Sequence, residues 1–401
     1  MNPPAGPPST ARRIGHGSLA LLAAAAIWLP CLHFFYTRPA TVFHVTPGLS
    51  TRASELASRH LRLWTEPGLR QQELGRMRAS NAEWDFMGRS FLVWSLANMA
   101  LRDPPSSATY MQVIDQIIEE TLRLERQEGM HFFLMPYSKA RAFELEPARS
   151  LFLDGEIALM LAARRVAVEK PEYKALLADR VSVIVDRMRK SPALAAESYP
   201  DECWTFDHAV ALAAIRLSDH LDGTDHAGLC REWIALARQR LLHPASGLLV
   251  SSYSRKGEHQ DGPEGSTLWM VAHCLQLIDR DFARDQYERA RRDLGRTVLG
   301  FSYAREWPAS WHGRTDIDSG PIIPVLGVSA GSSGMAFVGA CAFGDWDYVR
   351  TLAATLDMAA FPSRRAGALR YCASNQVGDA ALLYATVLGP LWEKVTSRAK
   401  P

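Results

Sequence analysis

Titratable and aromatic side chains gather just before one expected helix, in the segment ESYPDECWTFDH that spans 197–208. Helix capping explains part of this density, because acidic residues favour the first turn of a helix. An active site is the alternative explanation, because binding residues are often carried by loops on a rigid scaffold. We therefore expect substrate contacts from five side chains of this segment: Tyr199, Asp201, Glu202, Trp204 and His208.

Two carboxyl groups are the strongest candidates for catalysis. Glu156 is followed by the apolar run IALM, so burial is expected to raise its pKa and keep it protonated. Asp207 lies at the start of a helix, where the helix dipole is expected to keep it ionised. Two such carboxyls facing one cavity can act as general acid and general base. The alternative is that both are capping groups or members of structural ion pairs.

Two later segments add candidate binding residues. The loop REWPASWHGRTDIDSGP (305–321) is polar and punctuated by glycine and proline, and we expect Trp311 to line the site. Tyr371, in LRYCASNQVGD (369–379), is expected to reach the same opening. The six cysteines and the histidines show no metal-ligand spacing, so we predict neither a metal nor another cofactor.

A helical scaffold must position these groups. After residue 50, apolar residues recur every three or four positions, and alternating strand-like runs are scarce. In most helix pairs the first helix is apolar, as in FDHAVALAAIRL, and several partners are charged, as in DQYERARRDLGRTV. Apolar helices are typically buried and amphipathic ones lie outside. We therefore predict an all-α domain, an α/α toroid of six hairpins, over 51–401. The expected helices span 51–64, 69–79, 83–101, 107–128, 151–167, 172–190, 207–221, 226–242, 266–279, 282–299, 330–343, 345–357 and 376–396.

Each expected inner helix begins with polar residues, and in a closed ring these ends would meet at one mouth. Capping also predicts acidic residues at helix starts, so the recurrence favours a shared site only modestly. The residues concerned are Glu83, Asp85, Asp154, Glu156, Asp207, His208, Glu264, Asp316, Asp318, Asn375 and Asp379.

The N-terminal fifty residues differ in composition from the rest. Residues 1–17 are rich in proline and glycine and contain an arginine pair, and residues 18–36 carry no formal charge over a length near that of a bilayer. The arginines predict a single-pass anchor with a cytoplasmic N-terminus and an extracytoplasmic, periplasmic or extracellular, main domain. A cleaved signal peptide is the alternative, but aromatic residues stand where a small-residue cleavage site would be. A linker over 37–50 would join the anchor to the domain.

The bulk composition limits the partners. The chain has 401 residues, a formal net charge of +2 and 47% hydrophobic residues, and it shows no concentrated lysine or arginine block. These values are typical of a globular protein and give no indication of nucleic-acid binding. We expect a small-molecule substrate and a membrane contact through the N-terminal helix; the sequence leaves the oligomeric state open.

The stretch from Tyr199 to Arg305 resembles the linalool dehydratase/isomerase family. The similar features are the Pro-Asp loop, the helix ending DHLDGTDHAGLCREWIALARQRLLHPASGLLVSSYS, and the helix pair around DRDFARDQYERARRDL. Weaker similarity extends over Glu83 to Trp392. The resemblance implies an α/α toroid, often extracytoplasmic, that acts on small isoprenoid alcohols by acid/base chemistry without a metal.

The aligned residues depart from the family's pattern. The family uses two cysteines around the Pro-Asp loop, and Ser198 and Asp207 stand at those positions here. The family's histidine on the earlier inner helix corresponds to Glu156, and no counterpart of its N-terminal Asp and Tyr is found. Carboxyl groups therefore replace thiol and imidazole groups.

Three functions follow from these observations. The first is lyase, isomerase or hydratase chemistry on a small, apolar alcohol, with Glu156 and Asp207 as the catalytic pair. The second is hydrolysis or lysis of a glycan, for which toroids and paired carboxyls are also suited. The third is a non-catalytic member that binds a lipid or an envelope partner. An enclosed apolar pocket would favour the first function, and an open acidic groove the second.

Overall fold

The computed structural model describes residues 10–315 and 319–397 and is mostly helical, with fifteen α-helices in these ranges. Asp316 and Asp318, expected near the mouth, lie outside the described residues. Six helices form a closed inner ring in which each contacts the next and the last contacts the first. They are α4 (Ala82–Arg102), α6 (Leu151–Ala167), α8 (Thr205–Asp222), α10 (Gly265–Leu275), α12 (Ala330–Phe343) and α14 (Gln376–Val387).

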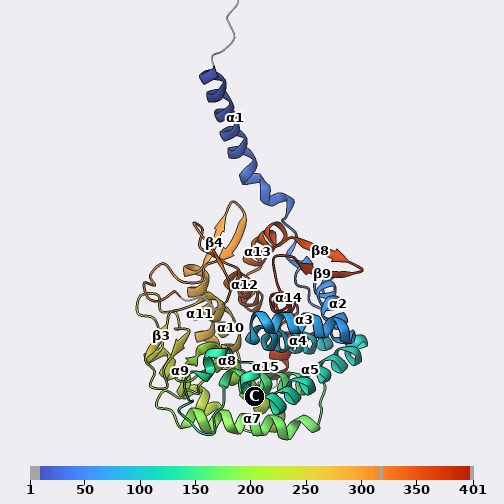
Figure 1. Ribbon diagram of the computed structural model, residues 1–401, viewed down its shortest axis with the longest axis vertical. Coiled ribbons are helices and arrows are strands. Elements are labelled where there is room, and N and C mark those ends of the chain that lie inside the picture. Colours follow the sequence, from blue (N-terminus) through green and yellow to red (C-terminus); the bar gives the residue numbers. More distant parts are fainter. Residues whose placement is uncertain (1–9, 316–318, 398–401) are drawn as a thin grey trace, which may run out of the picture.

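The outer helices surround this ring (Figure 1). Their burial follows an amphipathic stripe: α11 buries Phe282, Ala283, Gln286, Tyr287 and Ala290, which recur at one helical face. The inner helices α6 and α8 are instead buried on nearly all sides. This contrast confirms the inner and outer assignment made from composition. The outer helices are α2 (Thr51–Thr65), α3 (Pro67–Ser80), α5 (Ser107–Glu128), α7 (Glu172–Arg189), α9 (Ala227–Arg240), α11 (Arg280–Asp293) and α13 (Trp346–Ala359).

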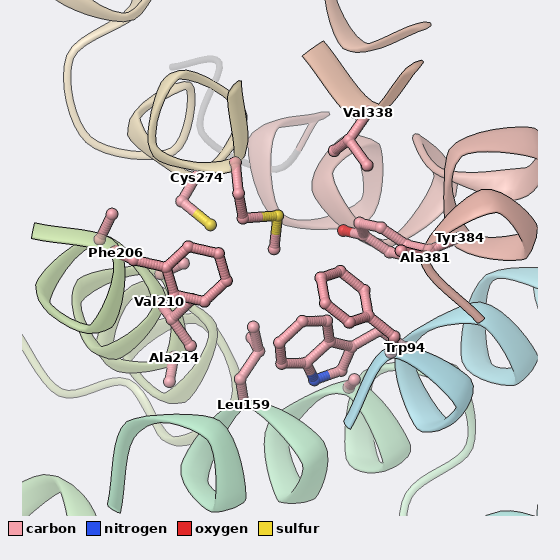
Figure 2. Close-up of a cluster of buried hydrophobic side chains, with 14 of the residues drawn as sticks. Trp94, Leu159, Phe206, Val210, Ala214, Cys274, Val338, Ala381 and Tyr384 are labelled. Carbon is pink, nitrogen blue, oxygen red and sulfur yellow. The ribbon is translucent and has the colours of Figure 1, made fainter. Parts of the chain in front are cut away.

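Small residues allow the inner helices to approach closely. A Cβ added at Gly155 on α6 would lie only 3.1 Å from the Cβ of Ala211 on α8. Near this contact the barrel interior is filled by apolar side chains, which point toward one another from all six inner helices (Figure 2). Trp94, Leu159 and Val210 belong to this packed centre. The interior is therefore a close-packed core at this level and not an open channel.

The helix α15 (Pro390–Ser397) closes the barrel at the ends of α4, α6 and α8. The Leu391 N–H donates to Asn98 Oδ1 (3.1 Å), and Trp392 Nε1 donates to the His273 carbonyl (3.2 Å). The sequence analysis expected one helix over 376–396. That expectation is wrong, because Gly389 at φ 124° precedes a proline and breaks the segment into α14 and α15.

Short strands lie between the helices along the chain, and the sequence analysis expected none of them. The expected helix over 282–299 ends at Asp293, and Gly295–Val298 forms a strand that pairs with Phe301–Ala304. Gly295 is a poor helix former, and the two-residue turn that follows it favours a hairpin. The strands are β1 (Cys203–Trp204), β2 (Ser252–Tyr253) and β3 (His259–Asp261) in one sheet, β4 (Gly295–Val298), β5 (Phe301–Ala304), β6 (Ile322–Ile323) and β7 (Val328–Ser329) in a second, and β8 (Pro362–Arg365) with β9 (Ala368–Tyr371) in a third.

The N-terminal helix α1 (Thr10–Cys31) projects from the domain, and none of its residues is buried (Figure 1). With the following 3₁₀ helix η1 (Leu32–Phe35) it forms an apolar stretch long enough to cross a membrane. Its length and composition fit an anchor and an N-terminal signal sequence alike. The helix begins earlier than the expected span over 18–36. The remaining 3₁₀ helices are η2 (Ala40–Val42), η3 (Pro104–Ser106), η4 (Met130–Phe132) and η5 (Pro136–Lys139).

Candidate active site at the mouth of the barrel

The starts of the inner helices lie together at one end of the barrel. The charge of Glu83, in the first turn of α4, acts on both Glu156 of α6 and Asp207 of α8. The side chain of Glu306 accepts hydrogen bonds from Ser266 at the start of α10 and from Ser329 before α12. Ser251 joins the two groups, because its carbonyl accepts from the Thr205 N–H of α8 (2.8 Å) and its hydroxyl accepts from the Glu264 N–H before α10 (3.0 Å). Five of the six helix starts therefore meet at one mouth.

Glu156 lies on α6 one turn above Leu159 and is fully buried, with 0% of its surface exposed. Neither of its carboxyl oxygens has a hydrogen-bond partner of ordinary geometry in the part of the chain that the structure describes. Burial raises the pKa of Glu156 well above its usual range, and the charges of Asp207 and Glu83 raise it further. The nearby Ser90 hydroxyl opposes this shift only in part, because it donates to the Phe86 carbonyl (3.3 Å). Burial therefore favours the protonated form of Glu156.

Asp207 lies on α8 one turn above Val210 and is also buried. Burial raises the pKa of its carboxyl to about 8; the Ser198 hydroxyl lowers it and the charge of Glu83 raises it. The expectation that the helix dipole keeps Asp207 ionised is therefore wrong. A helix dipole contributes at most about 2 kcal/mol, whereas full desolvation of a carboxylate shifts its pKa by several units.

The two carboxyls form a coupled pair, called here the interior pair. The charge of Asp207 raises the pKa of Glu156, which requires the two groups to be close. The contact of Gly155 with Ala211 brings their helices together at this level. Cys274 of α10 lies near enough that the charge of Glu156 raises its thiol pKa, in addition to burial. The interior pair thus lies between a polar mouth and the apolar centre shown in Figure 2.

A tight turn forms the loop in front of α8. Tyr199 and Glu202 exchange backbone hydrogen bonds (3.2 and 2.9 Å) around Pro200 and Asp201. Proline at the second position of a turn, with Asp201 at φ 60° in the third, is the pattern of a type II turn. The Tyr199 hydroxyl donates to Glu83 and accepts from the Met135 N–H (2.9 Å). The turn therefore places Tyr199 beside Glu83, at the mouth.

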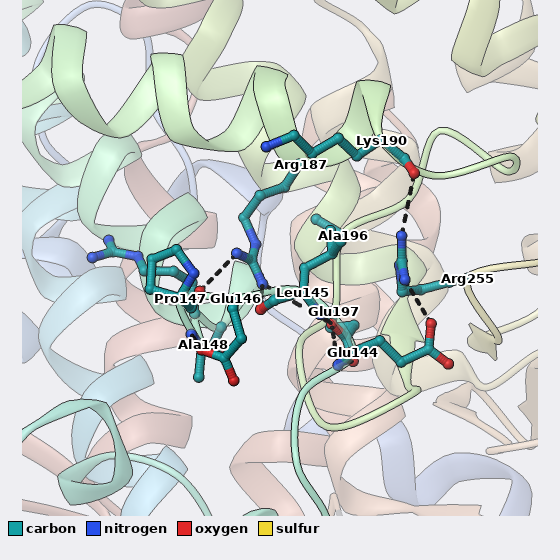
Figure 3. Close-up of polar contacts among 12 residues, drawn as sticks. Glu144, Leu145, Glu146, Pro147, Ala148, Arg187, Lys190, Ala196, Glu197 and Arg255 are labelled. Atoms are coloured by element: carbon teal, nitrogen blue, oxygen red, sulfur yellow. Dashed lines mark hydrogen bonds and ion pairs between the residues drawn. The ribbon is translucent and has the colours of Figure 1, made fainter.

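Glu197 anchors this loop and is not available for chemistry. Its buried carboxylate accepts hydrogen bonds from the backbone N–H groups of Glu144 and Leu145, at 2.9 to 3.3 Å (Figure 3). It also accepts from the Asp201 N–H (3.0 Å). Arg187 lies 4.0 Å from the same carboxylate and donates to the Leu145 and Pro147 carbonyls. The segment before α6 and the segment before α8 are thereby tied together.

Three other acidic residues expected at the mouth are paired with arginines. Asp85 pairs with Arg89 (3.0 Å), and Asp379 lies 3.5 Å from Arg59. Burial still raises the pKa of Asp379 to about 7. Asp154 forms ion pairs with arginines from two other segments, Arg149 and Arg180. The alternative of structural ion pairing therefore describes these three positions, although not Glu156 and Asp207.

His208 lies in the wall of the barrel although it follows Asp207 in the sequence. Its Nε2 accepts from the Ala196 N–H (3.0 Å), and its Nδ1 donates to the Trp204 carbonyl (2.7 Å). Its ring lies nearly parallel to the Trp233 ring, with 6.2 Å between the ring centroids. Both ring nitrogens are thus hydrogen-bonded within the wall. His208 points away from Asp207 because successive residues of an α-helix are rotated by about 100°. Trp204 is half-buried on β1, and its buried Nε1 has no hydrogen-bond partner among the described residues.

The contacts found for Trp311 and Tyr371 are with residues other than the interior pair. Trp311 Nε1 donates to the Arg314 carbonyl (2.9 Å), and its ring packs edge-on against His243 at 5.5 Å. Tyr371 is buried on β9, and its hydroxyl donates to Asp357 (3.4 Å). Their predicted roles as substrate contacts stay predictions without a contact to support them.

Two hollows lie away from the interior pair. One has a volume of about 380 Å³ and is lined by Glu125, Arg126, Arg149, Asp154 and Arg180, among others. The second, of about 530 Å³, lies near the far ends of α6 and α8 beside α15. The first is lined largely by charged residues and the second by a mixture of charged, polar and apolar residues, and neither includes Glu156 or Asp207. Within 10–315 and 319–397, no group of three or more His, Cys, Asp or Glu side chains is arranged to hold a metal ion.

Residues missing from the predicted site also lie close to the interior pair. Glu83 was noticed as an acidic start of an inner helix, and Ser90 lies two turns further along the same helix face. Cys274 approaches from α10, a helix for which only Glu264 was considered. Helical periodicity could have identified Ser90, whereas the position of Cys274 depends on how the ring closes.

The fold and the site together define an α/α toroid with buried carboxyls at its mouth. The solved α-1,6-mannanase of glycoside hydrolase family 76 from Salegentibacter sp. HEL1_6 has a TM-score of 0.51 and 10% identity, covering 84% of this chain and 99% of its own. The family 76 α-mannanase from Bacteroides thetaiotaomicron has a TM-score of 0.49 and 9% identity, covering 78% and 87%. These likenesses concern the fold alone.

Sequence comparison identifies the family. The linalool dehydratase/isomerase family matches residues 154–377, which is more than half of the chain, so the protein belongs to this family. The match includes both members of the interior pair. No curated protein matches the chain.

Proposed function

We propose that this protein is a membrane-anchored, extracytoplasmic enzyme that performs lyase, isomerase or hydratase chemistry on a small apolar alcohol. Glu156 and Asp207 are the catalytic residues, and the reaction uses no cofactor. One observation carries this proposal: a fully buried carboxyl, whose oxygens have no hydrogen-bond partner of ordinary geometry among the described residues, lies near a second buried carboxyl at the boundary of an apolar interior. Burial of such a group lowers the stability of the fold, and carboxyls with strongly shifted pKa values are concentrated at functional sites.

The surroundings of the pair support an apolar substrate. Val210 and Leu159 follow Asp207 and Glu156 by one turn on their helices, and both belong with Phe206 and Trp94 to the buried apolar cluster of Figure 2. A polar oligosaccharide would leave most of its hydroxyl groups unpaired against these side chains. An alcohol with one hydroxyl group and a hydrocarbon body would place the hydroxyl at the carboxyls and the hydrocarbon against the apolar centre.

We assign the two roles from the burial of the two carboxyls. Asp207, with a pKa of about 8, is the first to lose a proton, and the more deeply buried Glu156 keeps its own. Glu156 then donates its proton to the substrate hydroxyl as the C–O bond breaks and water leaves. Asp207 accepts a proton from the neighbouring carbon as the C=C bond forms. Transfer of a proton from Asp207 to Glu156 restores the starting state, and the reverse sequence adds water.

The turn before α8 is the proposed entrance for the substrate. Tyr199, Asp201, Glu202 and Trp204 lie on this turn and the strand that follows it, and we retain them as substrate contacts. We leave out His208, Trp311 and Tyr371, because their polar atoms are engaged elsewhere. The correspondence of Ser198, Asp207 and Glu156 to the family's cysteines and histidine remains part of the proposal.

The helix α1 is the proposed membrane anchor. Arg12 and Arg13 lie in its first turn, which favours a cytoplasmic N-terminus. We retain the division into a tail over 1–17, an anchor over 18–36, a linker over 37–50 and a catalytic domain over 51–401. The apolar helix begins at Thr10, so the tail and the anchor overlap in one continuous helix.

The test is turnover by the purified full-length chain, offered small terpenoid alcohols and, separately, oligosaccharides. The wild type is compared with Glu156→Gln, Asp207→Asn and the control Asp186→Asn, whose carboxylate is exposed on α7. The proposal expects alcohol turnover by the wild type and the control only. Turnover of oligosaccharides would support the glycan alternative, and equal alcohol turnover by all four proteins would exclude the pair from the mechanism.

A further inference from the structure

The hairpin of β4 and β5 exposes apolar side chains at its tip. Val298 is 47% exposed and Leu299 is 48% exposed. Leu299 (φ 50°) and Gly300 (φ 81°) are the two central residues of the turn, and both have positive φ. Asn, Asp and Gly are the usual residues at such positions, because a leucine is sterically disfavoured there. An exposed leucine at this position suggests that the tip contacts an apolar phase.

The tip lies where the N-terminal helix meets the domain. A Cβ at Gly300 would lie 2.3 Å from the ring of His33, so the turn packs directly on η1. The ring of Phe301 lies 6.3 Å from His33 and 6.2 Å from Tyr36. In Figure 1, α1 leaves the domain at the end that carries β4, α13 and the β8–β9 hairpin, and α7 lies at the opposite end.

The same junction exposes aromatic and basic side chains. Phe34 and Phe35 of η1 are 68% and 63% exposed. Arg38 follows them, and Arg296 of β4 donates to backbone carbonyls of nearby residues. Arg365 of β8 is exposed and forms no ion pair within the described residues. Aromatic residues bordered by arginines are typical of protein surfaces at the level of lipid headgroups.

We propose that these residues form a membrane-facing rim, defined as Phe34, Phe35, Val298 and Leu299 with the flanking Arg38, Arg296 and Arg365. The rim enters the interface of the bilayer that α1 crosses and holds the toroid against the lipid surface. Continuity with the membrane helix, exposed apolar side chains and positive charge toward anionic headgroups all favour lipid as the occupant. The inference rests on α1 being an anchor, as set out in the proposed function.

The test measures the lipid contact of the tip in the full-length chain. The protein is placed in phosphatidylglycerol-containing bilayer discs, with Cys31→Ser and Cys372→Ser, because the other four cysteines are buried. An environment-sensitive dye is attached at Leu299→Cys or, as the matched control, at Leu176→Cys. Leu176 is 39% exposed on α7, at the far end of the domain. Doxyl-labelled lipids should quench the dye at residue 299 at least about twofold more strongly than at 176.

Each other outcome overturns the rim in a recognisable way. Equal quenching at the two sites, with the chain retained in the discs, would show a tip in water. If the dye were shielded from water but not quenched by the lipids, and the shielding increased with protein concentration, a second copy of the chain would cover the tip. Release of the chain from the bilayer by alkaline washing would refute the anchor itself, and the rim with it. If quenching at residue 299 were as expected but the protein did not turn over alcohols, the proposed function would be wrong and the proposal of a membrane-facing rim would stand.

Discussion

Two acidic residues that are two positions apart on α6 have opposite surroundings. Asp154 is buried within an ion-paired cluster, defined here as Glu125, Arg149, Asp154 and Arg180. Glu156 is buried deeper, and its oxygens have no hydrogen-bond partner of ordinary geometry in the described part of the chain. Helical rotation directs one side chain toward α5 and α7 and the other toward the barrel axis.

The comparison separates structural carboxylates from those suited to chemistry. A buried carboxylate between two guanidinium groups remains charged and holds segments together. A buried carboxyl in apolar surroundings becomes neutral and can donate a proton. Glu197, with three backbone N–H donors, belongs to the first kind. The interior pair belongs to the second kind.

The strongest test of this comparison replaces each carboxyl of the interior pair in turn by the corresponding amide. Glu156→Gln or Asp207→Asn should reduce alcohol turnover by about 10²- to 10⁴-fold, because each removes a proton donor or acceptor. The free energy of unfolding of Glu156→Gln should change by no more than about 1 kcal/mol, since neither carboxyl oxygen of Glu156 has a hydrogen-bond partner of ordinary geometry among the described residues. Steady-state kinetics and urea unfolding measure both effects. If the loss of turnover were accompanied by a loss of folding free energy large enough to explain it, the pair would have a structural role.

The ion-paired cluster should respond in the opposite way. Asp154→Ala leaves Arg149 and Arg180 without their shared partner and should lower the free energy of unfolding by about 3 kcal/mol. The control Asp186→Ala removes an exposed pair with Lys190 and should lower it by less than about 1 kcal/mol. Urea unfolding at neutral pH measures both values. An Asp154 variant as stable as the control would remove the distinction between the two regions.

The pH dependence of stability should depend on Asp207. The pKa of this carboxyl is raised from 3.8 to about 8 by burial, so the folded state binds the proton more tightly than the unfolded state. Stability from this group is full below pH 4 and is lost as the pH rises to about 8. Unfolding at pH 5 and pH 8 should show a decrease of about 3 to 4 kcal/mol that Asp207→Asn abolishes. A decrease of the same size in the variant would assign the effect to other groups.

A smaller effect is expected from the helix contact that brings the pair together. Gly155→Ala would place a Cβ 3.1 Å from the Cβ of Ala211, so α6 and α8 must separate slightly. The free energy of unfolding should fall by about 1 kcal/mol, and turnover should fall by about tenfold as the carboxyls move apart. Calorimetry and kinetics measure these changes. A variant with normal stability and turnover would show that the close approach is not needed.

The sequence predicted the ring and the burial of Glu156 for a sound physical reason. Inner helices must be apolar on most sides, and the run after Glu156 has this composition. The sequence did not predict the protonation of Asp207, because the depth of burial depends on all six helices. It also could not place His208, whose neighbour Trp233 comes from a separate helix. The positions of Trp311 and Tyr371 depend on loop packing that no local pattern encodes.

The most direct test of the central claim is the protonation of the interior pair. Infrared difference spectra between the wild type and Asp207→Asn isolate the carboxylic-acid C=O stretch of this one residue. The account predicts a protonated carboxyl at pH 6 whose band disappears with a midpoint near pH 8, and a second band, absent from Glu156→Gln, that persists at that pH. An Asp207 that is already ionised at pH 6, with a midpoint near pH 4, would contradict it.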